Sequence, residues 1–412
     1  MKILLLHQYY LEENDSGGSR WNEITKMWAE KGHNITVLAG MMNANGKEKL
    51  PEYKGLYFKL KQQGDVKVWR CHVSEAYNKS FLGRLWGYFS FMFSSIWAGL
   101  FKAKGKFDVV IVTSPPLFVG FSGYILSRFK SIPLVFEVRD LWPESAIDTG
   151  VLTNKVIINL AYWFEAFIYR KAKLINVLTP AFYKTLKEVK NIPEHKLLMI
   201  PNAADFSLSE TLLQTFDAET FRKEHNFDGK FVITYVGAHG VANHLEQVLE
   251  AGKSLQDTNV LFVLIGQGME KERLKNMAAE QHITNVLFLD PVPKKDVFKY
   301  ILASDMGASV LKKVDTFKTV YSNKTFDYMS CRKPIIMAID GVSRELVEAS
   351  GAGAYVEPEN TKQYDTIIRQ YMADPDRIKR EGNSGYNYAK ANFDREVLAS
   401  RYLEQIEKIA QK

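Results

Sequence analysis

Short apolar runs rich in valine, isoleucine and leucine recur along the whole chain, separated by segments with a helical pattern. Such runs are typical of parallel strands that are buried on both faces. The expected strands are KILLLHQ, NITVLAG, VKVWRCH, DVVIVTS, PLVFEVR, LINVLTP and KLLMIPN, followed by FVITYVG, VLFVLIG, NVLFLDP, MGASVL, PIIMAI and GAYVEP. Because strands alternate with helices, the sequence predicts an α/β protein with two doubly wound domains.

The domain boundaries follow from interruptions of this pattern. At 412 residues the chain is long for one hydrophobic core. The strand pattern stops after Pro201, so we expect one domain at 1–205 and a second at 206–384. The remaining segment, 385–412, reads as an amphipathic helix that can pack back on the N-terminal domain. Two such domains facing a central cleft would hold a ligand at the carboxyl ends of both sheets.

Charge and cysteine content limit the class of protein. The formal net charge of +7 arises in the first half, whereas 206–412 contain slightly more acidic than basic residues. A basic half can face nucleic acid, anionic lipid or a phosphorylated substrate. Cys71 and Cys331 show no CxxC or Cys/His spacing, so we expect neither a disulfide framework nor a zinc site. The apolar run in MKILLLHQYY is too short for a signal peptide and predicts a buried first strand in a cytoplasmic protein.

An aromatic segment stands apart at Phe81 to Phe107. It has no charged residue from Leu85 to Phe101 and ends with three lysines, at 102, 104 and 106. The segment is shorter than the roughly 20 apolar residues that a membrane-spanning helix needs, and it contains glycine and serine. It is either a buried crossover helix or a helix lying in the membrane interface, with its lysines on the headgroups.

Three glycine-rich turns follow predicted strands. They are DSGGSR at Asp15–Arg20, GAHG at Gly237–Gly240 and GQG at Gly266–Gly268. Glycine lets the backbone approach an anion at a helix N-terminus, although a tight turn explains any one of these motifs equally well. Since all three would lie at the same edge of their sheets, together they favour an anion site.

The stretch VYSNKTFDYMS predicts a helix that begins at Asn323 or Lys324. A lysine in the first turn opposes the helix dipole unless an anion lies there. The free amides of Tyr321, Ser322 and Asn323 would then bind a pyrophosphate together with Lys324, and Asp327 would accept from a ribose diol. Alternatively, Lys324 extends into solvent and Asp327 is a surface acid.

Taken together, these segments resemble retaining glycosyltransferases of the GT-B fold, family 4, particularly bacterial enzymes that add N-acetylfucosamine-type sugars to O-antigen and capsule. The resemblance rests on GGSRW, FEVRDLWPES, KLLMIPNAAD, YVGAHGVANHLEQVLEA, IGQGMEKERL, YSNKTFDYMSCRKPII and GVSRELVEASGAGAYVEP. It implies two Rossmann-like domains, the N-terminal one for the acceptor and the C-terminal one for the nucleotide sugar. It also implies a UDP-sugar donor, a polyprenyl-diphosphate-linked sugar as acceptor and no metal. The enzyme would be peripheral on the inner face of the cytoplasmic membrane, bound through Phe81 to Lys106.

The resemblance also places the donor site. Of the two acids in the family pattern, the second falls on Asp327, but the first falls on Thr319, which suits a deoxy or N-acetylated sugar. The family's Arg and Lys pair is absent from GVANHLEQVLEA, so Lys324 becomes the candidate for the missing charge, with Arg20 and Lys312 or Lys313 as helpers. The predicted donor-binding residues are Gly17, Gly18, Arg20, Gly237, His239, Gly240, Gly266, Tyr321, Ser322, Asn323 and Asp327.

On the acceptor side, the family's His-Asp pair appears here as Arg139 and Asp140. Asp140 would accept from or orient the acceptor hydroxyl, and Arg139 would face the sugar or its phosphate. The predicted catalytic residues are therefore Asp140, Arg139 and Lys324, and the acceptor-side residues are Glu137, Trp142 and Glu144.

Two other functions are open at this point. A UDP-sugar epimerase of the same fold would need acid and base groups at the second carbon of the sugar, and the aromatic, basic surface would be superfluous. A non-enzymatic, basic peripheral membrane-binding protein would use that surface alone. RNA binding would require aromatics interleaved with Arg and Lys on a sheet face, so no nucleic-acid partner is expected.

Overall fold

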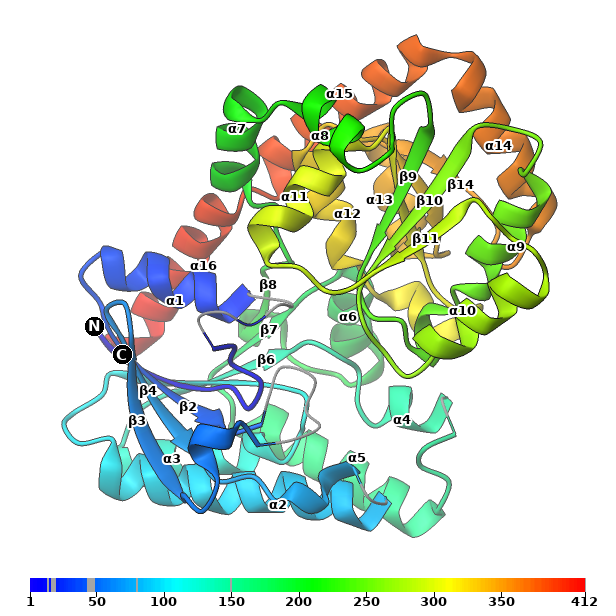
Figure 1. Cartoon of the computed structure of the whole chain (residues 1–412). Helices are drawn as coiled ribbons and strands as arrows, with labels where there is room; N and C mark the ends of the chain where they lie inside the picture. Colours follow the sequence, from blue (N-terminus) through cyan, green and yellow to red (C-terminus); the bar gives the residue numbers. More distant parts are fainter. Residues whose placement is uncertain (13–14, 16–19, 43–48, 79–80, 149, 412) are drawn as a thin grey trace. The chain divides into compact units, whose positions relative to one another are not determined.

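The computed structural model describes residues 1–12, 15, 20–42, 49–78, 81–148 and 150–411 (Figure 1). The chain forms two compact units, Met1–Pro201 with Glu396–Lys412, and Asn202–Arg395. From the sequence, the boundaries were expected after residues 205 and 384. In the structure, the second unit extends to Arg395, and only the last helix returns to the first unit.

The first unit contains a sheet in the order β3-β4-β2-β1-β5-β6-β7-β8, parallel except for β3, which is antiparallel to β4. All of its strands except β3 were expected from the sequence. β3 was missed because it is a polar edge strand, FKLKQQ, with no continuous apolar run. The strands are β1 (Lys2–Leu6), β2 (Asn34–Gly40), β3 (Phe58–Gln63), β4 (Val66–Cys71), β5 (Val109–Thr113), β6 (Leu134–Val138), β7 (Leu174–Val177) and β8 (Leu197–Met199).

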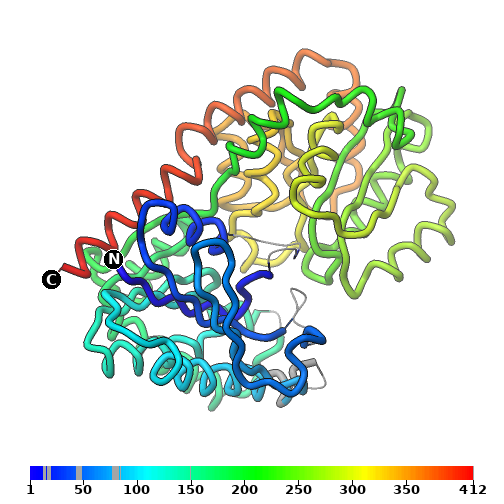
Figure 2. Tube along the Cα trace, turned by 60° about the vertical axis from the view of Figure 1, so that its left-hand side comes forward, coloured from blue at the N-terminus to red at the C-terminus, as the bar shows by residue number. Residues whose placement is uncertain are grey.

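Helices cover both faces of this sheet. One face carries α1 (Arg20–Glu30) and α16 (Arg395–Ala410), which run side by side (Figure 1 and Figure 2). Their contact is specific, because the Trp28 indole donates to the Ala399 carbonyl at 2.9 Å. The other face carries α2 (Phe81–Trp97), which continues as a π-helical turn at Ala98–Lys102, together with α3 (Val119–Lys130) and α5 (Lys155–Lys171). Shorter helices are α4 (Glu144–Asp148) and α6 (Pro180–Lys184).

The aromatic segment is a crossover helix with two different sides. Phe91 and Ser95 of α2 are fully buried, and the Ser95 hydroxyl donates to the Ser122 hydroxyl of α3 at 3.1 Å. Trp86, Phe93 and Trp97 are more than half exposed. The inner side of the helix therefore agrees with a crossover helix, and contact of its outer side with a membrane interface stays a prediction. Among the described residues, no helix is long and apolar enough to cross a membrane.

The second unit contains a fully parallel sheet in the order β11-β10-β9-β12-β13-β14, and every one of these strands was expected. The strands are β9 (Phe231–Val236), β10 (Val260–Ile265), β11 (Val286–Leu289), β12 (Met306–Val310), β13 (Ile335–Ala338) and β14 (Gly353–Tyr355). The predicted α/β fold with two doubly wound units is thereby confirmed.

In the described part of the second unit, two large apolar cores and a smaller cluster of Phe227, Val232, Val263 and Ile265 cover the faces of the sheet. α9 (Glu246–Ser254), α10 (Lys271–Glu280) and α14 (Thr361–Ala373) contribute to the first core. The second core receives α7 (Phe206–Thr215), α11 (Lys294–Ala303), α12 (Asn323–Ser330), α13 (Val342–Ser350) and α15 (Pro375–Asn392). α8 (Ala218–Glu224) precedes β9. This arrangement brings the turns after β9, β10 and β12 to one edge of the sheet, together with the start of α12.

Candidate functional site

The two glycine-rich turns of the second unit pack against each other. The amide of Gly237 donates to the Ile265 carbonyl, and the amide of His239 donates to the Gln267 carbonyl, both at 3.0 Å. A Cβ atom added to Gly266 would lie 1.8 Å from the Gly237 carbonyl oxygen, and one added to Gly268 would lie 2.2 Å from that of His239. Close backbone contact therefore requires these glycines even without a ligand. Donor binding by Gly237, Gly240 and Gly266 stays a prediction.

His239 is a buried, neutral imidazole. Neither ring nitrogen has a hydrogen-bond partner among the described residues. The ring lies 6.1 Å from the rings of Tyr235 and Phe288, measured between centroids. Burial is the main cause that lowers the pKa of His239 to about 4, and the Lys271 ammonium contributes to the same shift. His239 can therefore offer a hydrogen bond to a ligand at neutral pH, but not a positive charge.

α12 begins at Asn323, as the sequence predicted. Helix geometry leaves the amides of Asn323 and Lys324 without an intrahelical acceptor. The Ser322 hydroxyl does not cap them, and its oxygen is buried without a partner in the described structure. Tyr321 packs edge-on against Phe326, at 5.9 Å between ring centroids, so its ring supports the turn. The Ser322 amide, which was expected to be free, donates to the Ser343 hydroxyl at 3.3 Å. The donors left at the start of α12 are therefore the amides of Asn323 and Lys324.

The Lys324 side chain runs past the turn after β9. Its Cε atom lies 3.3 Å from where a Cβ of Gly237 would be, and its ammonium lies 4.7 Å from the centre of the Tyr235 ring. The described residues give this ammonium no hydrogen bond or ion pair. Burial lowers the pKa of Lys324 to about 8, opposed by the Asp327 carboxylate. Lys324 is partly buried, and a partly desolvated cation without an ion pair is costly, so its position favours an anionic ligand.

Asp327 lies in a charged group that the sequence analysis only partly identified. Burial raises the pKa of Asp327 to about 6, Lys294 opposes this rise and Asp205 adds to it. Lys294 itself forms an ion pair with Asp205 at 2.6 Å, and Arg395 reaches the same carboxylate at 3.2 Å. The sequence did not predict the other members of this network, which are Asp205, Lys294 and Arg395. Up to 190 positions separate them, so no local pattern indicates that they meet.

Lys312 and Lys313, the proposed additional phosphate-binding residues, have different surroundings. Lys313 is paired with Glu357 at 2.7 Å. The Lys312 side chain is exposed, and its backbone amide donates to the Ala242 carbonyl at 2.9 Å, which ties the turn after β12 to the turn after β9. The Thr319 hydroxyl donates to the Thr316 carbonyl at 2.7 Å. Lys312 is therefore the better candidate for a helper.

In the first unit, Arg20 and Glu137 form an ion pair. The Arg20 guanidinium donates to the Glu137 carboxylate at 3.0 Å and to the carbonyls of Ile200 and Pro201 at 2.8 and 2.5 Å. The same carboxylate accepts from the Trp21 indole and the Asn176 amide, each at 2.9 Å, and is fully buried. Both groups therefore have internal partners that hold the sheet edge together. Donor binding by Arg20 and an acceptor-side role for Glu137 stay predictions.

Arg139 and Asp140 lie at the carboxyl end of β6. The Asp140 carboxylate accepts from the Ser145 hydroxyl at 2.7 Å, and burial raises its pKa, to which Glu144 adds. Arg139 donates no hydrogen bond to a described residue, and burial lowers its pKa. A partly buried arginine and a carboxyl group with a raised pKa at one sheet edge are typical of a binding or catalytic site.

Two unpredicted side chains lie at the same edge, after β1. His7 Nδ1 and both polar side-chain atoms of Gln8 are buried without partners in the described part of the chain. Burial lowers the pKa of His7, and Arg139 is the next largest cause. The available signal was their position directly after the first strand.

Glu144 is held by a lysine that the sequence analysis did not single out. The Lys190 ammonium lies 2.7 Å from Glu144 and 2.5 Å from Glu165. Burial raises the pKa of Glu165 to about 7. Trp142 packs against Phe118 with 6.1 Å between ring centroids. Gly17 and Gly18 lie outside the described residues.

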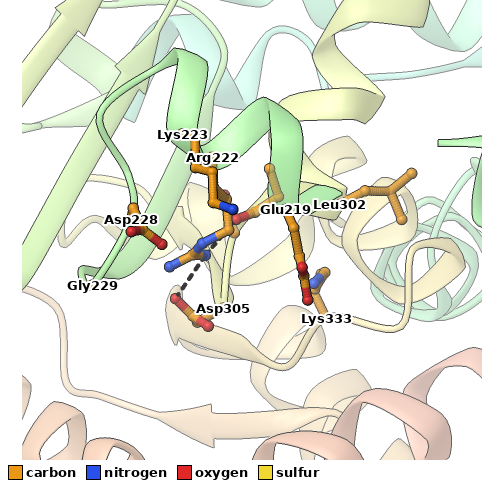
Figure 3. Close-up of a pocket in the computed structure, with 10 residues that line it drawn as sticks. Glu219, Arg222, Lys223, Asp228, Gly229, Leu302, Asp305 and Lys333 are labelled. Atoms are coloured by element: carbon orange, nitrogen blue, oxygen red, sulfur yellow. Dashed lines mark hydrogen bonds and ion pairs between the residues drawn. The ribbon is translucent and has the colours of Figure 1, made fainter. Parts of the chain in front are cut away.

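A cavity of about 570 Å³ lies elsewhere in the second unit (Figure 3). Asp305 and Lys333, which line it, precede β12 and β13, so the cavity lies at the amino-terminal edge of the sheet. Arg222 crosses it and donates to the Ala303 carbonyl at 2.6 Å and to Asp305 at 3.3 Å. No predicted site residue lines this cavity, so we do not assign the active site there.

Two family models match parts of this chain. The family "Glycosyl transferases group 1" matches residues 217–388, and "Glycosyl transferase 4-like domain" matches residues 17–203. The chain is 23% identical to WcaI of Escherichia coli K12, assigned as a colanic acid biosynthesis glycosyl transferase, over 98% of this chain and 100% of WcaI.

Solved structures show the same fold. Sucrose-phosphate synthase from Thermosynechococcus elongatus has a TM-score of 0.74 at 15% identity, covering 99% of this chain and 98% of that one. HepE from Anabaena, solved with UDP-glucose, has a TM-score of 0.70 at 19% identity, covering 99% and 100%.

Proposed function

This chain belongs to the GT-B glycosyltransferases, with a group 1 domain and a 4-like domain, and on that premise we propose that it transfers a sugar from a UDP-sugar to a polyprenyl-diphosphate-linked sugar. The reaction retains the anomeric configuration and needs neither a protein nucleophile nor a metal. The product belongs to a surface polysaccharide such as O-antigen or capsule. The similarity to WcaI and the UDP-glucose bound to HepE support this assignment.

The observation that carries the proposal is the environment of Lys324. A partly buried ammonium that has no ion pair with a described residue lies beside the free amides at the start of α12. A diphosphate supplies the missing negative charge and accepts from those amides. When the sugar leaves, negative charge develops on the same phosphate, so Lys324 stabilises the leaving group more strongly in the transition state.

The remaining roles divide between the two units. Asp327 accepts from the ribose, and Thr319 stands where the family has an acid, which suits an N-acetylated deoxyhexose such as N-acetylfucosamine. In the first unit, Asp140 orients the acceptor hydroxyl and Arg139 faces the sugar or its phosphate. We place the enzyme at the inner face of the cytoplasmic membrane, where a lipid-linked acceptor is found.

A thermal-shift titration with UDP, GDP, ADP and dTDP tests the donor. Because UDP binds the folded state, it is expected to raise the melting temperature, whereas the other nucleotides do so weakly or not at all. The shift is expected to be the same with EDTA. Absence of stabilisation by any nucleotide would contradict the proposal, and loss of the UDP effect in EDTA would show that a metal takes part.

Asp140→Asn tests the acceptor side. We expect turnover to fall by about 100-fold or more, because an amide cannot take up a proton. Stabilisation by UDP should be unchanged, since Asp140 lies in the first unit and the nucleotide residues lie in the second. The measurement is UDP release from a UDP-sugar with a lipid-linked sugar acceptor. Turnover equal to wild type would remove Asp140 from the mechanism, and conversion of the UDP-sugar without acceptor would indicate an epimerase.

A further inference from the structure

Two helices of the first unit expose stripes of aromatic and aliphatic side chains. On α2 and the turn that continues it, Trp86, Phe93, Trp97 and Phe101 are each between 54 and 58% exposed. On α5, Leu160 and Trp163 are each 60% exposed. Each set repeats at the three-, four- or seven-residue spacing that places side chains on one face of a helix. Each helix therefore has an outward apolar stripe, and the stripe on α5 was not expected from the sequence.

The two stripes belong to one surface. α3 contacts both α2 and α5 and lies between them on the same face of the sheet (Figure 1). Tyr124 of α3 meets Phe167 of α5 edge-on, at 5.0 Å between ring centroids, and the Phe167 ring stacks on Trp163 at 5.9 Å. We name the outward face of α2, α3 and α5, including the Ala98–Lys102 turn, the apolar platform. Contiguous exposed apolar surface of this kind marks an interaction site.

The charges of the apolar platform identify its partner. These helices and the turn contain one acidic residue, Glu165, which is buried against Lys190. Their exposed charged side chains are all basic: Lys102, Arg128, Lys155, Arg170 and Lys171. A second copy bound by two-fold symmetry would place these cations against themselves, with no acid to pair them. An anionic lipid surface, by contrast, complements both the aromatics and the cations.

The platform also leads to the proposed acceptor site. α2, α3 and α5 run antiparallel to their neighbouring parallel strands, so their N-terminal ends lie at the carboxyl edge of the sheet, where Arg139 and Asp140 are. Phe118, just before α3, contacts Phe164 of α5 at 5.6 Å and Trp142 at 6.1 Å. Trp142 lies two residues after Asp140. Aromatic contacts therefore connect the platform to the loop that carries Asp140.

We propose that the apolar platform binds the surface of an anionic phospholipid bilayer, with the stripes of both α2 and α5 entering the interface. A lipid-linked acceptor would then reach Asp140 along Phe164, Phe118 and Trp142, a step that rests on the proposed function. The binding itself does not depend on nucleotide.

Vesicle flotation and lipid quenching test this proposal. The full chain is mixed with vesicles of phosphatidylcholine alone or with about one third phosphatidylglycerol. We expect binding to the anionic vesicles, weakened by salt, and quenching of Trp86, Trp97 and Trp163 by brominated lipid. Two double variants, Trp97→Ser with Phe101→Ser and Leu160→Ser with Trp163→Ser, should each lower the partition coefficient by about tenfold or more. Val397→Ser, an exposed apolar residue of α16, is the matched control.

The following outcomes would contradict the membrane-binding proposal or a part of it. Absence of wild-type binding to anionic vesicles overturns the proposal. If only the α2 variant loses binding, the proposed contribution of α5 is wrong. If the Val397→Ser control loses binding equally, the effect is not specific to the apolar platform. A wild-type dimer that the double variants convert to monomer shows that the face joins two copies. UDP-dependent stabilisation, measured on the same variants, should be unchanged, which separates failure here from failure of the proposed function.

Discussion

Replacement of Lys324 by methionine is expected to stabilise the protein and to abolish its stabilisation by UDP. In the unfolded chain the ammonium has a pKa near 10.5, whereas burial lowers it to about 8 in the folded protein. At pH 7 the folded state must therefore hold a charge in an unfavourable place. Each unit of pKa shift corresponds to about 1.4 kcal/mol, and the cation–π contact with the Tyr235 ring offsets part of this energy. Removal of the charge should therefore raise the free energy of unfolding by about 1 to 3 kcal/mol.

The pH dependence gives this prediction a second, independent readout. Between pH 8 and 10.5 the unfolded state binds more protons at Lys324 than the folded state does. The titration of Lys324 therefore raises the free energy of unfolding of the wild type as the pH increases through this range. The methionine variant lacks that contribution. Urea unfolding at pH 7 and pH 9.5 measures both effects, and thermal shift with UDP measures binding. Lys312→Met, an exposed lysine at the same sheet edge, is the control and should not stabilise the protein.

Two results would contradict this account of Lys324. A methionine variant that is less stable than wild type would show that the ammonium is satisfied without a ligand. A variant that UDP still stabilises to the same extent would move the diphosphate away from α12. The predicted combination of higher stability and lost binding is expected where a charge is kept for function at a cost to the fold.

The fold was predictable because its strands are buried on both faces. Such strands read as uninterrupted apolar runs, and their crossover helices separate them, so order and class follow from the pattern. β3 was not predicted because an edge strand needs no continuous apolar run, and FKLKQQ has none. The start of α12 was predictable for a local reason, since Ser322 directly precedes it and its first residues, Asn323 to Thr325, are polar.

The site was predictable only where one short segment carries it. Lys324 and Asp327 lie one turn apart on α12, so their proximity follows from the sequence. Arg20 and Glu137 are separated by 117 positions, and nothing local shows that they neutralise each other. An arginine beside a glycine-rich turn has the same local sequence whether it binds a phosphate or an internal carboxylate. His7 and Gln8 were missed for a similar reason, because an unpartnered side chain is visible only once its surroundings are known.

Loss of Glu137 is expected to cost more stability than any other single change considered for this protein. Glu137→Ala would leave the Arg20 guanidinium, which is 9% exposed, without its counter-ion, and would also remove the acceptor of the Trp21 and Asn176 side chains. Removing one partner of a buried ion pair typically costs about 3 to 5 kcal/mol. The measurement is the free energy of unfolding in urea. Glu194→Ala, which breaks the exposed pair with Lys187, is the control and should leave stability unchanged.

A double-mutant cycle with Arg20→Met decides whether the pair is structural or ligand-binding. If the two groups mainly satisfy each other, the double variant should lose less stability than the two single losses added together, because neither charge is then left unpaired. UDP should stabilise the double variant as it does wild type, since the pair lies in the first unit and the proposed nucleotide site lies in the second. If Glu137→Ala instead kept wild-type stability and lost only turnover, the carboxylate would belong to the acceptor site, and the structural role assigned to it here would be wrong.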